Sequence, residues 1–223
     1  MNIIQYNDRE MLAINVANAL AGELENALLV HDVISFAVPG GTTPGPVFDL
    51  LSATDLDWGR IRVMLTDERW VDVDHEMSNT RLIKERLLTG KAGAAQFVPF
   101  YRAGQSAAAG SAEVSAILKG LFPLSVLMLG MGGDMHTASL FPGAQGVAEA
   151  FADDAPLLCP IKVPDQDIER VTLPAHVLEG ALAKHLVIFG DDKRAALERA
   201  QNLPPQEAPI GAVLTGAKIH WAA

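Results

Sequence analysis

The chain has 223 residues, 49% of them hydrophobic, and a formal net charge of −10 at pH 7. No apolar run approaches the roughly 18 residues that a membrane-spanning helix requires, so we expect a buried core and no membrane contact. The acidic balance disfavours binding to nucleic acid, and the single cysteine, Cys159, excludes an internal disulfide. We therefore expect a cytoplasmic protein. A small anionic ligand is still compatible with this charge, because a few cations and a helix N-terminus can form a local phosphate site.

Strand-like apolar runs alternate with helical segments along the chain. Predicted strands cover residues 3–6, 33–38, 61–66, 97–100, 124–129, 157–163, 171–173, 185–189 and 218–221. Predicted helices cover residues 8–30, 78–88, 106–119 and 191–201, and short helices begin at Pro44, with Thr43 as N-cap, and at Pro174. Such alternation is typical of an α/β protein with a doubly wound, mostly parallel, Rossmann-like sheet that has helices on both faces. We expect one domain over residues 1–223, because neither a repeat nor a linker interrupts the pattern.

A glycine- and threonine-rich turn follows the strand predicted at residues 33–38. It contains Gly40, Gly41, Thr42 and Thr43 and leads into a short helix. Glycines allow a ligand to approach the backbone closely, hydroxyls add donors, and the helix N-terminus attracts an anion. The turn is a candidate phosphate-binding loop, and the alternative is an ordinary tight turn.

Two acids and an arginine, Asp67, Glu68 and Arg69, follow the strand predicted at residues 61–66. They could position a polyol and stabilise a negative charge at the carboxyl edge of the sheet, whereas surface salt bridges are the alternative. The acidic segment at residues 72–76 lacks the spacing and the glycine of a calcium loop, so we expect no metal site.

A second glycine-rich turn follows the strand predicted at residues 124–129 and presents Asp134 and His136. An imidazole beside a carboxylate is suited to proton transfer, and open α/β sheets bind ligands at this edge. A dinucleotide fingerprint is the alternative, but its last glycine is replaced by Met135. Ser139 lacks the surroundings of a nucleophile and is expected to cap a helix.

Two further cations, Arg170 and Lys193, lie at the boundaries of predicted elements. Lys193 falls in the first turn of a predicted helix, where a positive charge opposes the helix dipole. That placement is unfavourable unless an anion is shared there.

Together these motifs resemble the 6-phosphogluconolactonases in content and order over nearly the whole chain. The matching segments are Gly40-Gly41-Thr42-Thr43-Pro44, Thr66-Asp67-Glu68-Arg69, Ser78-Asn79, the Gly130-x-Gly-x-Asp-x-His136 turn with Thr137-Ala138-Ser139-Leu140-Phe141-Pro142, Arg170-Val171-Thr172 and Gly190-x-x-Lys193. The related glucosamine-6-phosphate isomerase/deaminases carry a Met-Asp-Glu-Tyr-like segment in place of the second motif and an Asn-Glu-Pro-like segment in place of Leu140-Phe141-Pro142. One departure is Met135, where the family usually has glycine.

The resemblance implies hydrolysis of 6-phospho-D-glucono-1,5-lactone to 6-phospho-D-gluconate in the oxidative pentose phosphate pathway, with no cofactor and no metal. His136 is expected to act as general base, Asp134 to orient it, Arg69 to stabilise the oxyanion and Asp67 to hold Arg69. The residues expected to bind the phosphate are Gly40, Gly41, Thr42, Thr43, Arg170 and Lys193. Two alternatives stay open, an amino-sugar-phosphate isomerase/deaminase and a non-catalytic sugar-phosphate sensor. The expected partner is the small-molecule sugar phosphate alone, bound by a monomer or weak homo-oligomer.

Overall fold

The computed structural model describes residues 3–164 and 166–223. Its centre is a seven-stranded sheet with the order β1-β10-β9-β6-β2-β3-β5, and every pairing in it is parallel. The strands are β1 (Ile3–Gln5), β2 (Ile34–Val38), β3 (Ile61–Leu65), β5 (Gln96–Val98), β6 (Val126–Leu129), β9 (Ala183–Phe189) and β10 (Lys218–Ala222). The predicted α/β class and mostly parallel sheet are confirmed.

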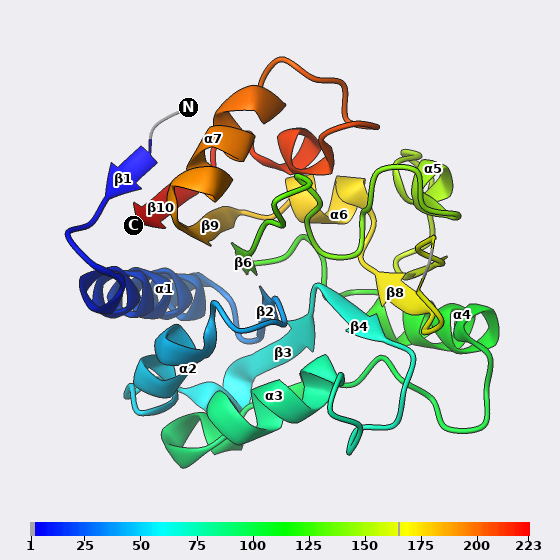
Figure 1. Cartoon of the computed structure of the whole chain (residues 1–223). Coiled ribbons are helices and arrows are strands. Elements are labelled where there is room, and N and C mark those ends of the chain that lie inside the picture. The colour runs from blue at the N-terminus through cyan, green and yellow to red at the C-terminus, as the bar shows by residue number, and fades with distance from the viewer. Residues whose placement is uncertain (1–2, 165) are drawn as a thin grey trace.

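Helices cover both faces of this sheet (Figure 1). They are α1 (Arg9–Val30), α2 (Gly45–Ser52), α3 (Asn79–Arg86), α4 (Ala107–Leu118), α5 (Val147–Ala150), α6 (Ala175–Glu179), α7 (Asp191–Ala200) and the 3-10 helices η1 (Trp58–Arg60), η2 (Gly90–Ala94) and η3 (Pro209–Val213). Helix α2 packs against α1 and α3, whereas η3 packs against α6 and α7. None of the helices within residues 3–164 and 166–223 is long and apolar enough to cross a bilayer.

The chain changes direction across the sheet between β2 and β6. From β2 it proceeds to β3 and β5 on one side, and from β6 to β9 and β10 on the other. Both strands are buried at every residue, as expected for central parallel strands covered on both faces. In open α/β sheets a crevice for ligands forms outside the carboxyl ends of two such strands. The turns after β2 and β6 are therefore placed side by side at this switch point.

A second, antiparallel sheet of three short strands adjoins the end of β3. It has the order β4-β8-β7 and consists of β4 (Asp67–Arg69), β8 (Arg170–Thr172) and β7 (Cys159–Ile161). The strands predicted at residues 157–163 and 171–173 therefore exist. The expectation that they belong to the mostly parallel central sheet is wrong, because they pair in this small antiparallel sheet. Strand β4 was not predicted, because two acids and an arginine carry no strand pattern.

Polar side chains cap three of the helices, whereas the predicted cap of a fourth is absent. The side chains of Asp8, Ser78 and Ser106 each accept a hydrogen bond from a backbone N–H in the first turn of α1, α3 and α4. The prediction of Thr43 as N-cap of α2 is wrong, because Pro44 takes that position with φ −78° and no side chain caps the helix. The ring of proline sets φ near the helical value by itself, so no side-chain cap is required to start the helix.

Candidate active site

A cavity of about 260 Å³ opens at the switch point. It is bordered by the turns after β2 and β6, by β4 and β8 of the small sheet, and by the first turn of α7. Of the predicted site residues, Asp134 alone does not line it. Those that do are Gly40, Gly41, Thr42, Thr43, Asp67, Arg69, His136, Arg170 and Lys193. Residues from five separate segments are thus brought together as the sequence analysis expects.

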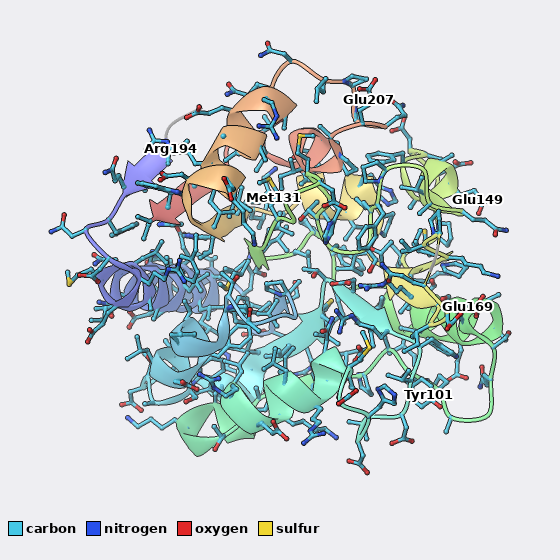
Figure 2. All side chains as sticks on the ribbon, viewed as in Figure 1. Tyr101, Met131, Glu149, Glu169, Arg194 and Glu207 are labelled. Atoms are coloured by element: carbon cyan, nitrogen blue, oxygen red, sulfur yellow. The ribbon has the colours of Figure 1, made fainter. Side chains whose placement is uncertain are left out.

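Apolar side chains from the central sheet complete the cavity wall. Met128 and Leu129 come from β6, Val187 from β9, and Met131 from the turn that follows β6. Figure 2 shows Met131 near the middle of the molecule between β6 and α7, whereas Glu149, Glu169 and Glu207 lie toward its periphery. The polar groups of the site therefore lie beside apolar residues of the central sheet.

The turn after β2 requires both of its glycines. A Cβ on Gly40 would lie 1.9 Å from Oδ1 of Asn79, and Gly41 has φ +85°, which favours glycine. Asn79 was not among the predicted site residues, although Ser78-Asn79 was one of the matching motifs. It lines the cavity, and its Nδ2 donates to the backbone oxygen of Asp67 at 2.9 Å. Helix α2 starts directly after the turn, so its N-terminal dipole favours an anion there.

Three cations converge on the cavity in this acidic protein. Arg69 and Arg170 are directly opposite each other in the β4–β8 pairing, an arrangement in which like charges repel. The pKa of Arg170 is lowered first by burial and second by the charge of Arg69. Burial also lowers the pKa of Lys193, which forms no ion pair within the part of the chain that the structure describes. This clustering of positive charge is suited to an anionic ligand.

Arg69 and Asp67 are fixed by different partners. Nη1 of Arg69 donates to the backbone oxygen of Met77 at 2.7 Å. The carboxylate of Asp67 accepts hydrogen bonds from the hydroxyls of Ser139 at 2.6 Å and Thr66 at 3.2 Å. The prediction that Asp67 holds Arg69 is wrong, because within residues 3–164 and 166–223 the two side chains form neither a hydrogen bond nor an ion pair. The predicted helix-capping role of Ser139 is also wrong, because Ser139 lies in a turn and is fully buried.

Glu68 stands outside the cavity and joins β4 to the start of α3. Its fully buried carboxylate accepts hydrogen bonds from the backbone N–H groups of Arg69, Asn79 and Thr80 and from two hydroxyls, those of Ser78 and Thr80. Burial raises the pKa of Glu68, whereas these hydrogen bonds act in the opposite direction. The alternative of a surface salt bridge is therefore wrong for Glu68.

The turn after β6 holds the imidazole against a carboxylate. Nδ1 of His136 lies 2.5 Å from Oδ1 of Asp134, and a Cβ on Gly132 would lie 2.2 Å from the same imidazole nitrogen. An ionised carboxylate only accepts hydrogen bonds, so Nδ1 carries the proton in the neutral ring and Nε2 keeps its lone pair. The histidine is therefore in the tautomer that a general base acting through Nε2 needs.

Met135 adopts the left-handed conformation, with φ +66°. A non-glycine residue there costs about 1–2 kcal/mol. Its backbone N–H donates to the oxygen of Gly132 at 3.0 Å, and its own oxygen accepts from the N–H of Ile210 at 3.1 Å. These bonds keep the turn in the conformation that a glycine would adopt more easily, and His136 still lines the cavity.

Comparisons with known proteins identify the family of this chain. A family model described as glucosamine-6-phosphate isomerases/6-phosphogluconolactonase matches residues 7–221. A 6-phosphogluconolactonase from Mesorhizobium japonicum is 38% identical over 97% of this chain and 93% of its own length. One from Pseudomonas aeruginosa is 38% identical over 92% of this chain and 88% of its own.

Solved structures of 6-phosphogluconolactonases have the same fold as this chain. The crystal structure of a 6-phosphogluconolactonase from Shewanella baltica matches with a TM-score of 0.95 and 30% identity, covering 99% of this chain and 97% of that one. That of Thermotoga maritima matches with a TM-score of 0.82 and 26% identity, covering 99% and 98%. The matched residues and the shared fold show that the chain belongs to the glucosamine-6-phosphate isomerase/6-phosphogluconolactonase family.

Proposed function

We propose that this protein hydrolyses 6-phospho-D-glucono-1,5-lactone to 6-phospho-D-gluconate, the lactonase step of the oxidative pentose phosphate pathway. The observation that carries the proposal is the presence of a His–Asp pair and three cations around one cavity. Relatives named 6-phosphogluconolactonase, which this chain matches over most of their length, support the same activity.

The phosphate is bound at the turn after β2. Backbone N–H groups of Gly40 and Gly41, the hydroxyls of Thr42 and Thr43, and the start of α2 supply donors and a favourable dipole. Arg170 and Lys193 add positive charge, and a phosphate bound at Arg170 offsets its repulsion by the facing Arg69. Binding at this remote end positions the lactone carbonyl near His136.

Hydrolysis then proceeds by general-base catalysis. Nε2 of His136 takes a proton from water while the water oxygen forms a bond to C1 of the lactone. The C1 oxyanion collapses, the bond from C1 to the ring oxygen breaks, and His136 returns the proton to that oxygen. The new carboxylic acid ionises in solution, and the imidazole is neutral again for the next cycle. Asp134 keeps the imidazole in its reactive tautomer and stabilises the transient imidazolium.

Arg69 stabilises the charge that develops on the carbonyl oxygen. Its Nη1 is fixed on Met77, and its buried Nε has no hydrogen-bond partner within residues 3–164 and 166–223. A fixed guanidinium beside the reacting carbon needs little reorganisation during the reaction. A δ-lactone is an activated ester, so we propose that neither a cofactor nor a metal takes part.

The decisive experiment is a lactonase assay on freshly generated 6-phosphogluconolactone with the spontaneous rate subtracted. We expect His136→Ala to lower kcat by about 10²–10⁴-fold with a much smaller change in KM. The exposed His31 is the matched control, and His31→Ala should leave both constants unchanged. An unchanged kcat for His136→Ala would remove this residue from the mechanism.

Two other functions are distinguished by simple measurements. An amino-sugar-phosphate isomerase/deaminase would release ammonia from glucosamine 6-phosphate, and the relatives reported above do not favour it. A non-catalytic sensor would bind 6-phosphogluconate but leave the lactone to decay at its spontaneous rate.

The setting of the enzyme follows from the same chemistry. We propose a cytoplasmic enzyme that has the sugar phosphate as its partner, binds no nucleic acid, and is a monomer or weak homo-oligomer with one domain. Light scattering during gel filtration measures the oligomeric state directly.

A further inference from the structure

One phenylalanine ring contacts two side chains of the site. The ring of Phe141 is stacked on that of His136, with centroids 3.9 Å apart and an interplanar angle of 22°. The guanidinium carbon of Arg170 lies over the same ring, 5.0 Å from its centroid. Phe141 is itself only 8% exposed and does not line the cavity.

The ring is held in place by the turn that carries it. The N–H of Phe141 donates to the oxygen of Ser139 at 3.2 Å, and its own oxygen accepts from the N–H of Ala144 at 3.2 Å. Ser139 is in turn bonded to the buried Asp67 at 2.6 Å. The ring therefore has a fixed place relative to the strand that bears Asp67 and Arg69.

His136 is constrained at one edge by Asp134, through Nδ1. A single hydrogen bond leaves the imidazole free to turn about that contact, whereas stacking on an aromatic face also fixes the plane of the ring. With both constraints, Nε2 has one direction.

Arg170 is constrained in a similar way. Its Nε and Nη2 donate to Oε1 of Gln166 at 3.1 and 2.8 Å, while the opposed Arg69 repels it. Cation–π attraction to Phe141 adds a contact that opposes this repulsion.

We propose that Phe141 is a positioning residue that sets the orientation of both the general base and one phosphate-binding arginine. It touches neither the substrate nor the reacting atoms and acts through His136 and Arg170. This inference rests on the proposed lactonase function. The contact of the ring with His136 should affect kcat, and its contact with Arg170 should affect KM.

The first test compares three variants in the lactonase assay. Phe141→Leu keeps an apolar side chain but removes the ring, and we expect about a tenfold lower kcat and a three- to tenfold higher KM. Phe141→Tyr keeps the ring and should return both constants to within about threefold of the wild type. Phe100→Leu, at a fully buried phenylalanine that lines no part of the cavity, should leave kcat and KM unchanged per folded molecule. If Phe141→Leu behaves like Phe100→Leu, the inference is overturned.

A double-mutant comparison separates the two contacts. In an Arg170→Ala background, Phe141→Leu should still lower kcat but should no longer raise KM. A purely structural role for Phe141 predicts the same KM increase in both backgrounds, and that result would refute the assignment.

Two measurements without turnover keep the inference separate from the proposed function. The ring protons of His136, assigned by comparison with His136→Ala, should move downfield in the proton NMR spectrum of Phe141→Leu as the ring current is lost. Inorganic phosphate should bind about three- to tenfold more weakly to Phe141→Leu than to the wild type, and equally to the two proteins in the Arg170→Ala background. If the wild type does not accelerate lactone hydrolysis, the proposed function fails, while these two results still decide whether Phe141 orients His136 and Arg170. Unchanged His136 resonances would overturn the stacking.

Discussion

Met135 offers a test of backbone strain. At this position we expect the usual order of stability of an alanine and a glycine variant to be reversed. At most positions alanine stabilises a protein relative to glycine, by about 0.4–1 kcal/mol, because glycine has more freedom in the unfolded chain. At φ +66° both methionine and alanine carry a steric cost of about 1–2 kcal/mol that glycine lacks. We therefore expect Met135→Gly to be more stable than Met135→Ala by about 1 kcal/mol, the difference between these terms.

The wild type provides a third point on this scale. Its half-buried side chain packs against the core, a contact that both variants lose equally. Met135→Ala should be the least stable of the three proteins, and Met135→Gly should recover much of the loss. A difference of about 1 kcal/mol corresponds to about 2–4 °C in Tm for a domain of this size.

The assay is urea unfolding, with the midpoint compared at equal m-values. Gly133 supplies the matched control, because its φ is outside the left-handed region and a Cβ there meets nothing within 4 Å. Gly133→Ala should leave stability unchanged or raise it by about 0.4–1 kcal/mol. Equal stability of Met135→Gly and Met135→Ala, or a more stable alanine variant, would refute the strain at this turn.

Three further predictions concern binding, pH and the buried carboxylate. Arg170→Ala and Lys193→Ala should each raise KM about tenfold with little change in kcat, and if neither does, the phosphate assignment is wrong. Burial lowers the pKa of His185 and of His220 to about 4, below the ordinary value of 6.5, so the unfolded chain binds more protons between these values. Stability should therefore be fully present above pH 6.5 and fall as the pH drops toward 4, and a flat urea midpoint between pH 6.5 and 5 would contradict this. Glu68→Gln should lower the free energy of unfolding by about 1–3 kcal/mol, because an amide NH2 group, which only donates, replaces one of the two oxygens that accept from five donors. An unchanged urea midpoint would disprove that role.

The sequence predicts well those features that depend on nearby residues. The helices that begin at Asp8, Ser78 and Ser106 were predicted, and each of these side chains accepts a hydrogen bond from the backbone N–H three residues further on. The two turns at the switch point were predicted because each follows an apolar strand, and parallel strands bring their carboxyl ends to one edge.

Contacts between distant parts of the chain were not predicted. The bond from Ser139 to Asp67 joins residues 72 positions apart, and the pairing of β4 with β8 places Arg69 opposite Arg170. No local pattern marks such partners, so the sequence analysis assigned Asp67 to Arg69 instead. The stack of Phe141 on His136 was missed for a different reason, since a phenylalanine in an apolar segment ordinarily indicates core packing.

The site is divided between two sheets. The glycine turn and the histidine turn extend from the large parallel sheet, whereas Arg69 and Arg170 belong to the small antiparallel one. The small sheet therefore carries the two arginine charges of the site, and the large sheet carries the proton-transfer pair. The histidine and the arginines meet only when the two sheets are packed together, so the complete site exists only in the folded protein.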